Sequence, residues 1–224
     1  YMVFYTALAN GVPEETFALI SEFHSSLSRG DVQSAFASFG PGGLYNSTEA
    51  EDETSAGVYK GTVVGSPELT EYFEFWYRML QTEWVPTGCR GDATTVTCNT
   101  ESRGLLTLFL PGGVAQGVVT YTFGPGGIDT VVDRTVRAAG SCGPGGCGGP
   151  DGFGLRGFWR SWMPENAPEV ELLWPGGNGD LDNGLDDQFA AAVWVYYPQF
   201  LMENGIYVPQ EYLERSSAGQ GSIR

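Results

Sequence analysis

Residues 114–137 read VAQGVVTYTFGPGGIDTVVDRTVR, and this stretch decides the fold. β-branched and aromatic residues dominate both of its halves, which is typical of strands, and the central GPGG is a turn sequence. We therefore predict two strands of about ten residues each, joined by a tight turn. The residues before this hairpin are expected to cover and extend it, and the residues after Ala139 to be an added segment.

Three helices are predicted ahead of the hairpin. The first begins at Pro13, which suits a first-turn position, and ends at Gly30. Asp31 is placed to cap a short second helix, and Ser66 followed by Pro67 opens the third. Apolar residues recur at helical spacing in the first helix at Phe17, Ile20, Phe23 and Leu27, and in the third at Leu69, Phe73, Trp76 and Leu80.

The remaining strands are predicted from alternation and from turn residues. Residues 84–101 form a hairpin, 105–110 an apolar strand, and 39–66 an exposed acidic loop. Helices followed by about five successive strands indicate an α+β fold, with the three N-terminal helices packed on a curved, mostly antiparallel sheet.

The composition changes abruptly after Ala139, where GSCGPGGCGGPDGFG cannot hold regular structure. Beyond it the chain is rich in aromatic residues, with a helix over 188–204 that Pro198 kinks or ends and a tail from Ser216 without order. The predicted organisation is an arm (1–12), a domain (13–138), a linker or loop (139–157) and a partly helical C-terminal extension (158–224).

Charge and composition exclude several functions. The net charge is −16 and Lys60 is the only lysine, so neither nucleic acid nor an anionic membrane surface is expected as a partner. No apolar run is long enough to span a membrane. A single histidine argues against multi-histidine metal sites, and no glycine-rich phosphate loop precedes a helix, so we predict neither metal nor cofactor.

The four cysteines lie in two close pairs, and sequence alone allows three pairings. Sequential pairing is the simplest, giving Cys89–Cys98 across the 84–101 hairpin and Cys142–Cys147 in the glycine-rich segment. Reduced, half-buried thiols at Cys89 and Cys98 are the alternative. Disulfides suit an oxidising compartment, and a chain that begins at Tyr1 hints at a removed leader. A secreted or cell-surface location is therefore predicted.

Residues 14–137 resemble the NTF2-like superfamily, the cone-shaped α+β fold that includes SnoaL-type polyketide cyclases. The resemblance is carried by SSLSRGDVQSAFASF, by YKGTVVGSPELTEYF and by the strands around YTFGPGGIDTV. It implies a pocket between the bent sheet and the helices, a small apolar ligand, and a homodimer or higher oligomer formed through the open sheet face. The residues expected to line this pocket are Phe23, Tyr72, Trp76, Val119 and Tyr121.

The resemblance also offers site patterns to compare. The steroid-isomerase pattern is absent. Phe23 occupies the position of its tyrosine, and Asn46–Ser47 and Val119 occupy the positions of its two acids. The epoxide-hydrolase pattern is matched in its two acids, Glu101 and Asp133, but not in its arginine.

Asp133 is the first candidate for a catalytic residue. A carboxyl group that faces an apolar cone would have a raised pKa, which suits general acid or base work. Glu101 with Arg103 could assist it, and His24 could reach the pocket as a base. Each candidate has a purely structural alternative. Asp133 could be a solvent-facing acid, Glu101 and Arg103 an exposed ion pair, and His24 a histidine at the helix edge.

These observations lead to two hypotheses. In the first, the domain binds a small apolar molecule and catalyses its isomerisation, cyclisation or hydration with Asp133 as base. In the second, the domain is a non-catalytic module, whose C-terminal segment fills the cone or builds a subunit interface. The sequence does not decide whether the protein is an enzyme.

Overall fold

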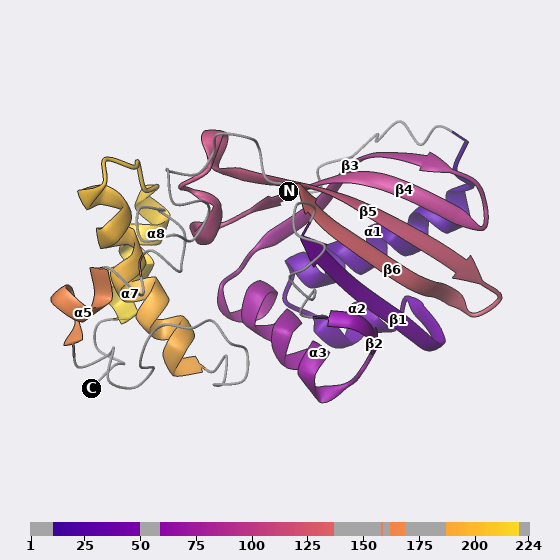
Figure 1. Ribbon diagram of the computed structural model, residues 1–224, viewed down its shortest axis with the longest axis horizontal. Coiled ribbons are helices and arrows are strands. Elements are labelled where there is room, and N and C mark those ends of the chain that lie inside the picture. Colours follow the sequence, from indigo (N-terminus) through magenta and orange to yellow (C-terminus); the bar gives the residue numbers. More distant parts are fainter. Residues whose placement is uncertain (1–10, 50–58, 137–157, 159–161, 169–186, 220–224) are drawn as a thin grey trace. The chain divides into compact units, whose positions relative to one another are not determined.

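The structure is a computed structural model that describes residues 11–49, 59–136, 158, 162–168 and 187–219. The chain divides into two compact units, which are described separately (Figure 1). The first comprises Tyr1–Ser102 and Ala115–Arg137, and the second Arg103–Val114 and Ala138–Arg224. Arg103–Val114, which we predicted to lie within the first domain, is thus grouped with the second unit.

The predicted helices of the first unit are present. They are α1 (Glu14–Ser28), α2 (Val32–Phe36) and α3 (Pro67–Phe73), which continues as a π-helix, η1 (Glu74–Met79). Gly30 follows α1 with a φ of 72°, a left-handed conformation that glycine adopts without strain. Ser66 caps α3, because its hydroxyl accepts a hydrogen bond from the Leu69 amide.

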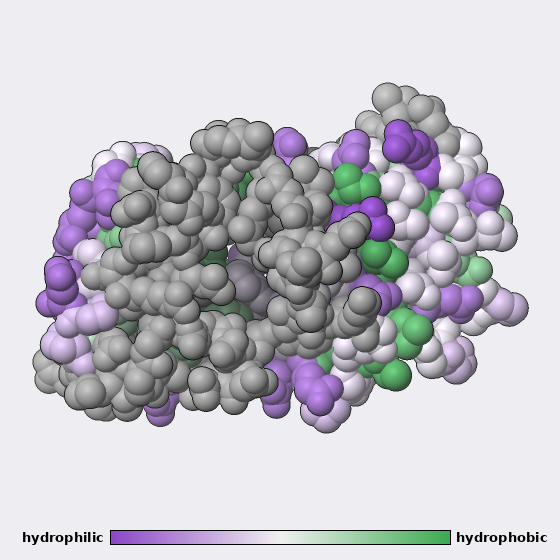
Figure 2. All heavy atoms as spheres, viewed as in Figure 1, coloured by the Kyte–Doolittle hydropathy of each residue, from purple (hydrophilic) through white to green (hydrophobic). Residues whose placement is uncertain are grey.

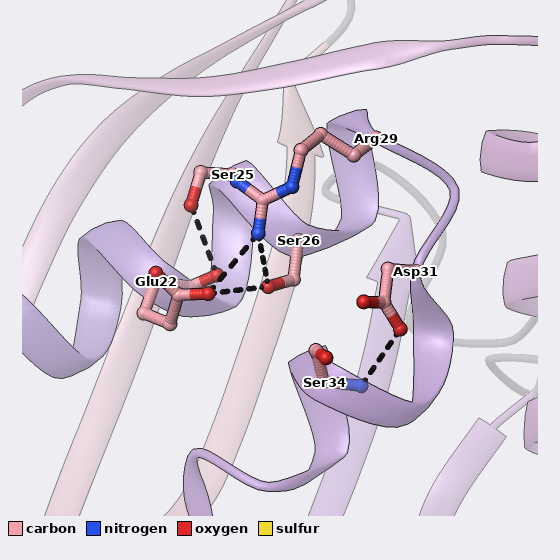
Figure 3. A network of polar contacts seen from close by, with 6 residues as sticks. All are labelled: Glu22, Ser25, Ser26, Arg29, Asp31 and Ser34. Carbon is pink, nitrogen blue, oxygen red and sulfur yellow. Dashed lines mark hydrogen bonds and ion pairs between the residues drawn. The ribbon is translucent and has the colours of Figure 1, made fainter.

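Polar side chains fix the turn between α1 and α2 (Figure 3). Arg29 Nη2 lies 3.1 Å from Glu22 Oε1 and donates to Ser26 Oγ at 3.0 Å. Asp31 caps α2 as predicted, since its Oδ1 accepts from the Ser34 amide at 3.0 Å. Hydrogen bonding from the Ser34 side chain, and then from its amide, lowers the pKa of Asp31. The sharp reversal lets two consecutive helices pack against each other.

Six strands form one open, mixed sheet in the order β2-β1-β6-β5-β4-β3. The predicted 114–137 hairpin is confirmed as β5 and β6, which pair antiparallel. β1 and β6 pair in parallel, so the last strand lies in the middle of the sheet. The predicted α+β fold class is confirmed. The strands are β1 (Phe39–Glu49), β2 (Tyr59–Val63), β3 (Glu83–Gly91), β4 (Thr95–Arg103), β5 (Val114–Gly124) and β6 (Gly127–Val136).

Two local predictions are wrong. Residues 39–66 were expected to be a loop, but 39–49 and 59–63 are β1 and β2. The expected strand 105–110 is instead the 3₁₀ turn η2 (Leu105–Thr107), followed by η3 (Pro111–Gly113). Thr107 favours this turn, because its hydroxyl donates to the carbonyl of Gly113 at 2.6 Å and accepts from the Gly104 amide at 3.1 Å.

The core of the first unit lies between the helices and one face of the sheet. Figure 1 shows α1 crossing one face of the strands, and α1 packs on β3. Large apolar side chains from both layers are fully buried there. They include Ile20, Phe23, Leu27, Leu69, Phe73, Val119 and Val131.

The predicted Cys89–Cys98 disulfide is confirmed, with an S–S distance of 2.02 Å. It joins β3 to β4 across their hairpin, and both cysteines are buried. The alternative of two reduced thiols is therefore wrong. The Cys142–Cys147 pair and the 139–157 linker lie outside the described residues.

The second unit contains α5 (Met163–Asn166), α7 (Asp187–Glu203) and α8 (Gln210–Gly219). The predicted C-terminal helix is confirmed, but Pro198 does not end it, since α7 continues to Glu203. The tail was expected to lack order from Ser216 onward, but α8 continues to Gly219, so this prediction is wrong for residues 216–219. Ser216 donates a hydrogen bond to the Val195 carbonyl at 2.9 Å. Residues 220–224 lie outside the described part.

No helix in the described part of the chain is long and apolar enough to cross a membrane. Figure 2 shows hydrophilic and apolar residues mixed over the visible surface of the described residues.

Candidate functional site

The inner face of the sheet presents a cluster of polar and aromatic side chains to the helices. Val119 lies opposite Asp133 in the β5–β6 pair, and Tyr121 lies opposite Val131. In the parallel β1–β6 pair, Tyr45 is level with Val131 and Ser47 with Asp133. Because residues in register share a face and alternate residues of a strand do as well, all six side chains point to the same side. The sheet register therefore brings Tyr45, Tyr121 and Asp133 together.

Asp133 is the acidic group of this cluster. The residue is half-buried, and its Oδ2 accepts a hydrogen bond of 3.2 Å from the Tyr45 hydroxyl. Burial raises the pKa of Asp133 from 3.8 to about 7, and the Tyr45 hydrogen bond opposes that rise. Both protonation states are therefore populated near neutral pH, which is the condition under which a carboxyl group transfers protons in both directions.

Several phenol groups surround this carboxyl. Burial raises the pKa of Tyr45 and of Tyr121 well above the usual value, and the negative charge of Asp133 adds to the effect. Burial and then the neighbouring Tyr72 and Asp133 do the same for Tyr77. These tyrosines consequently remain protonated and can act as hydrogen-bond donors in this interior.

His24 of α1 lies on the same side of the sheet and is only 2% exposed. Its Nδ1 is 3.1 Å from the Trp84 carbonyl oxygen, and its Nε2 contacts the Tyr121 hydroxyl. A carbonyl oxygen only accepts, so Nδ1 carries a proton and donates it. Burial lowers the pKa of His24 to about 3, only partly opposed by the Trp84 hydrogen bond, so the ring is neutral at physiological pH. Nε2 must therefore accept from the Tyr121 hydroxyl.

Aromatic rings from α3, η1 and β3 lie around this interior. The Phe73 ring lies 5.0 Å from Tyr45 and 5.6 Å from Tyr77, centroid to centroid. The ring of Tyr77 stacks on Trp84 at 6.0 Å, and Trp84 in turn contacts His24 at 4.3 Å. Aromatic rings with hydroxyl groups at their edges thus surround this interior.

The residues expected to line a pocket occupy different positions. Phe23, Val119 and Tyr121 are buried on the inner side, whereas Tyr72 and Trp76 are half-buried. The indole N–H of Trp76 is buried without a hydrogen-bond partner among the described residues. The structure therefore buries three of the five in the interior of the first unit and leaves two half-buried.

Glu101 and Arg103, which we expected to assist Asp133, are not brought to it. Thr97 of β4 and Thr120 of β5 meet on the outer face of the sheet, with their hydroxyls 3.2 Å apart. Glu101 is four residues after Thr97 on the same strand and so shares its outer face. Arg103 ends β4 and is exposed. The inner face of β4 is formed instead by its buried residues, Val96, Cys98 and Thr100.

Sequence reasoning missed three residues of the cluster: Tyr45, Tyr77 and Trp84. Tyr45 was missed because its strand is glycine-rich and was interpreted as a loop. Tyr77 was missed because η1 contains more residues per turn than the assumed α-helix, as shown by the hydrogen bond from the Leu80 amide to the Phe75 carbonyl. The alternating residue pattern at the start of the 84–101 hairpin was the signal that could have identified Trp84 as an inward-facing residue.

Within the described residues, no group of three or more histidine, cysteine, aspartate or glutamate side chains could hold a metal ion. The polar atoms of the cluster are hydroxyls, one neutral imidazole and one carboxyl group. Its own chemistry is therefore proton transfer and hydrogen bonding.

No protein-family model matches the chain, and no curated protein matches it. Solved structures do resemble it over about half its length. One is an NTF2-like protein of unknown function from Cytophaga hutchinsonii, 14% identical, covering 54% of this chain and 89% of its own, with a TM-score of 0.39. Another, from Methylobium petroleophilum, has a cystatin-like fold and is 13% identical, covering 56% of this chain and 79% of its own, with a TM-score of 0.41.

A third similar structure is SalBIII, an epoxide hydrolase/cyclase-like enzyme with a role in pyran ring formation in the polyether salinomycin. It is 15% identical, covers 55% of this chain and 92% of its own, and has a TM-score of 0.41. Each of these three likenesses covers little more than half of this chain.

Proposed function

We propose that the first unit binds a small apolar molecule between its helices and the inner face of its sheet, and that Asp133 serves there as a general acid–base. One observation carries this proposal: a half-buried carboxyl group, hydrogen-bonded by Tyr45, has a pKa of about 7 among aromatic rings. Carboxyl groups with ordinary pKa values are weak bases at neutral pH, and a raised pKa makes the group a better proton acceptor.

The reaction class that fits is proton transfer on a neutral substrate, as in an isomerisation, a cyclisation or a hydration. Tyr45 would hold the ionised form of Asp133 in place by donating to Oδ2, while the Phe73 and Tyr77 rings would contact the apolar part of the substrate. Glu101 and Arg103 have no part in this proposal because of their position on β4.

The test uses two probes and one matched pair of variants. Uptake of the neutral dye Nile red reports an apolar site, and the base-promoted ring opening of 5-nitrobenzisoxazole reports a base within it. Asp133→Asn should retain dye uptake and lose ring opening. Asp129→Asn, which alters an exposed acid on the same strand, should retain both.

In the wild type, the ring-opening rate should rise with pH around 7, as the carboxyl group ionises. Dye uptake with no ring opening above the buffer rate would remove the acid–base role and leave the non-catalytic binding module. Native mass spectrometry of protein from its source would then identify any retained ligand and report the oligomeric state, since a homodimer or higher oligomer is still a prediction.

We also propose that the protein is made in or exported to an oxidising compartment. The supporting observation is the buried Cys89–Cys98 disulfide. Finding these two thiols reduced in protein taken from its source would overturn this location.

A further inference from the structure

The hydrogen bonds of His24 fix the direction of a proton close to Asp133. His24 donates from Nδ1 to the Trp84 carbonyl oxygen at 3.1 Å, so its Nε2 is left as an acceptor. Tyr121 fills that acceptor with its hydroxyl proton. The proton of the Tyr121 phenol is therefore directed at His24 of α1.

Tyr121 is nevertheless a neighbour of Asp133 on the sheet. Tyr121 lies opposite Val131 and Val119 lies opposite Asp133, so Tyr121 and Asp133 are diagonal neighbours on one face of adjacent strands. The electrostatic influence of Asp133 on Tyr121 agrees with this closeness. Of the two phenols beside Asp133 on the sheet, Tyr45 donates to the carboxyl group and Tyr121 donates to His24.

We propose that His24 is a positioning residue for Asp133: by accepting the Tyr121 proton, it keeps the Tyr121 hydroxyl from donating to the carboxylate. Each donor to a carboxylate stabilises the ionised form and makes it a weaker base. Withholding one donor keeps Asp133 a proton acceptor that works near neutral pH. As a contribution to catalysis this inference rests on the proposed function, but the hydrogen-bond arrangement is measurable without any substrate.

The chain contains one histidine, which gives a direct measurement. In long-range ¹⁵N–¹H spectra of tag-free protein at pH 7, a single imidazole should show a protonated Nδ1 and an unprotonated Nε2. An Nε2-protonated ring or an imidazolium would overturn the proposal, because Nε2 could then not accept a hydrogen bond from Tyr121.

Two substitutions of His24 separate the positioning role from a merely structural one. The amide nitrogen of His24→Asn takes the place of Nδ1 and keeps a donor for the Trp84 carbonyl, but offers no acceptor to Tyr121. The longer His24→Gln places an amide oxygen near the position of Nε2 and restores that acceptor. The pKa of Asp133 is read from carboxyl ¹³C titration, assigned by the signal that is lost in Asp133→Asn.

The pKa of Asp133 should fall by about half a unit to one unit in His24→Asn and stay near the wild-type value in His24→Gln. The fall should disappear in His24→Asn/Tyr121→Phe, which lacks the released hydroxyl. An equal fall with and without the Tyr121 hydroxyl, or no fall in His24→Asn, would overturn the proposal.

If His24→Asn does not fold, Tyr121→Phe alone decides the question. A hydroxyl that already donates to His24 gives nothing to Asp133, so its removal should not raise the pKa of Asp133, whereas a rise would contradict the proposal. Failure of the ring-opening assay would remove only the catalytic meaning of Asp133 and would leave these titrations interpretable.

Discussion

The hydroxyl of Tyr45 donates a 3.2 Å hydrogen bond to Oδ2 of Asp133 across 88 positions of sequence. The bond joins a strand from the first quarter of the chain to the central strand of the sheet. Hydrogen bonding to a carboxylate favours its ionised form, and burial disfavours that form. The balance between these two effects sets where Asp133 titrates.

Replacing Tyr45 with phenylalanine should therefore raise the pKa of Asp133 above about 7. The hydrogen bond is lost while the burial is kept, so the ionised form loses its donor. The pH midpoint of the ring-opening rate should move upward, and the carboxyl ¹³C titration should move with it. Tyr207→Phe is the control, because that side chain is 80% exposed. A downward shift in Tyr45→Phe would contradict this account of the site.

Asp133→Asn should make the folded state more stable at pH 8. In the wild type, the folded protein retains the Asp133 proton up to about pH 7, whereas the unfolded chain loses it near 3.8. Stability from this group consequently falls as pH rises between these values. The neutral amide avoids this loss, which amounts to at most about 4 kcal/mol.

The measurement is urea unfolding of both proteins at pH 4 and at pH 8. The difference in unfolding free energy between variant and wild type should grow in favour of the variant from the lower to the higher pH. Asp129→Asn, on the exposed side of the same strand, should show no such growth. A difference that is constant over this range would mean that Asp133 is not desolvated.

Acid should destabilise the protein through His24. The pKa of this ring is about 3 when folded and 6.5 when unfolded, so the unfolded chain binds a proton first as pH falls. Stability from His24 is complete above pH 6.5 and is lost on the way down to about 3, by up to about 1.4 kcal/mol per pH unit.

Asp133 changes stability in the opposite direction over part of this range, so the effect of His24 is best measured in Asp133→Asn. Urea unfolding of that variant at pH 6.5 and at pH 4.5 should show a loss of about 2–3 kcal/mol from His24. An imidazole ¹H signal that titrates between pH 6 and 7 in the folded protein would show that the ring is solvated, contrary to the structure.

Removing the Cys89–Cys98 disulfide should lower stability by about 2–3 kcal/mol, the amount that the chain-entropy model gives for so short a loop. Alanine is the suitable replacement at both positions, because the sulfur atoms are buried and serine would bury two hydroxyls. The urea midpoint of the double variant should match that of the reduced wild type. An unchanged midpoint would show that the β3–β4 hairpin is held by its strand pairing alone.

The helices could be predicted from sequence because their signals are local. Gly30, Asp31 and Ser66 stand at helix ends and act within one turn of themselves. The β5–β6 hairpin was equally local, with its turn residues between two β-rich runs. The same reasoning placed Asp133 on the second strand of that hairpin.

β1 could not be predicted, because its stability comes from partners far away in sequence. Its first half contains Pro41 and several glycines, which disfavour strands in isolation. A side chain at Gly126 would meet the Pro41 ring, and one at Gly127 would meet the Ser38 carbonyl oxygen. The glycines thus permit a close approach of β1 to the β5–β6 turn, and only the tertiary structure shows that use.

The residues that surround Asp133 were predicted incompletely for a related reason. Glu101 and Asp133 each lie on a strand, but their faces depend on how β4, β5 and β6 align, which the spacing within one strand does not give. Tyr77 depends on the π-helix, for which the sequence has no known signature. The sequence therefore identified the carboxyl group together with Tyr121 and His24, but not Tyr45 and Tyr77.

The central position of β6 has a consequence for the order in which the chain can fold. β1 and β2 lie on one side of it, and β3, β4 and β5 on the other. A chain truncated before Gly127 holds two half-sheets that β6 does not join, and the edge of each is open to association. Such contacts between distant segments form slowly. Released chains truncated after residue 126 should therefore bind chaperones, and chains that include residues 127–137 should bind them less.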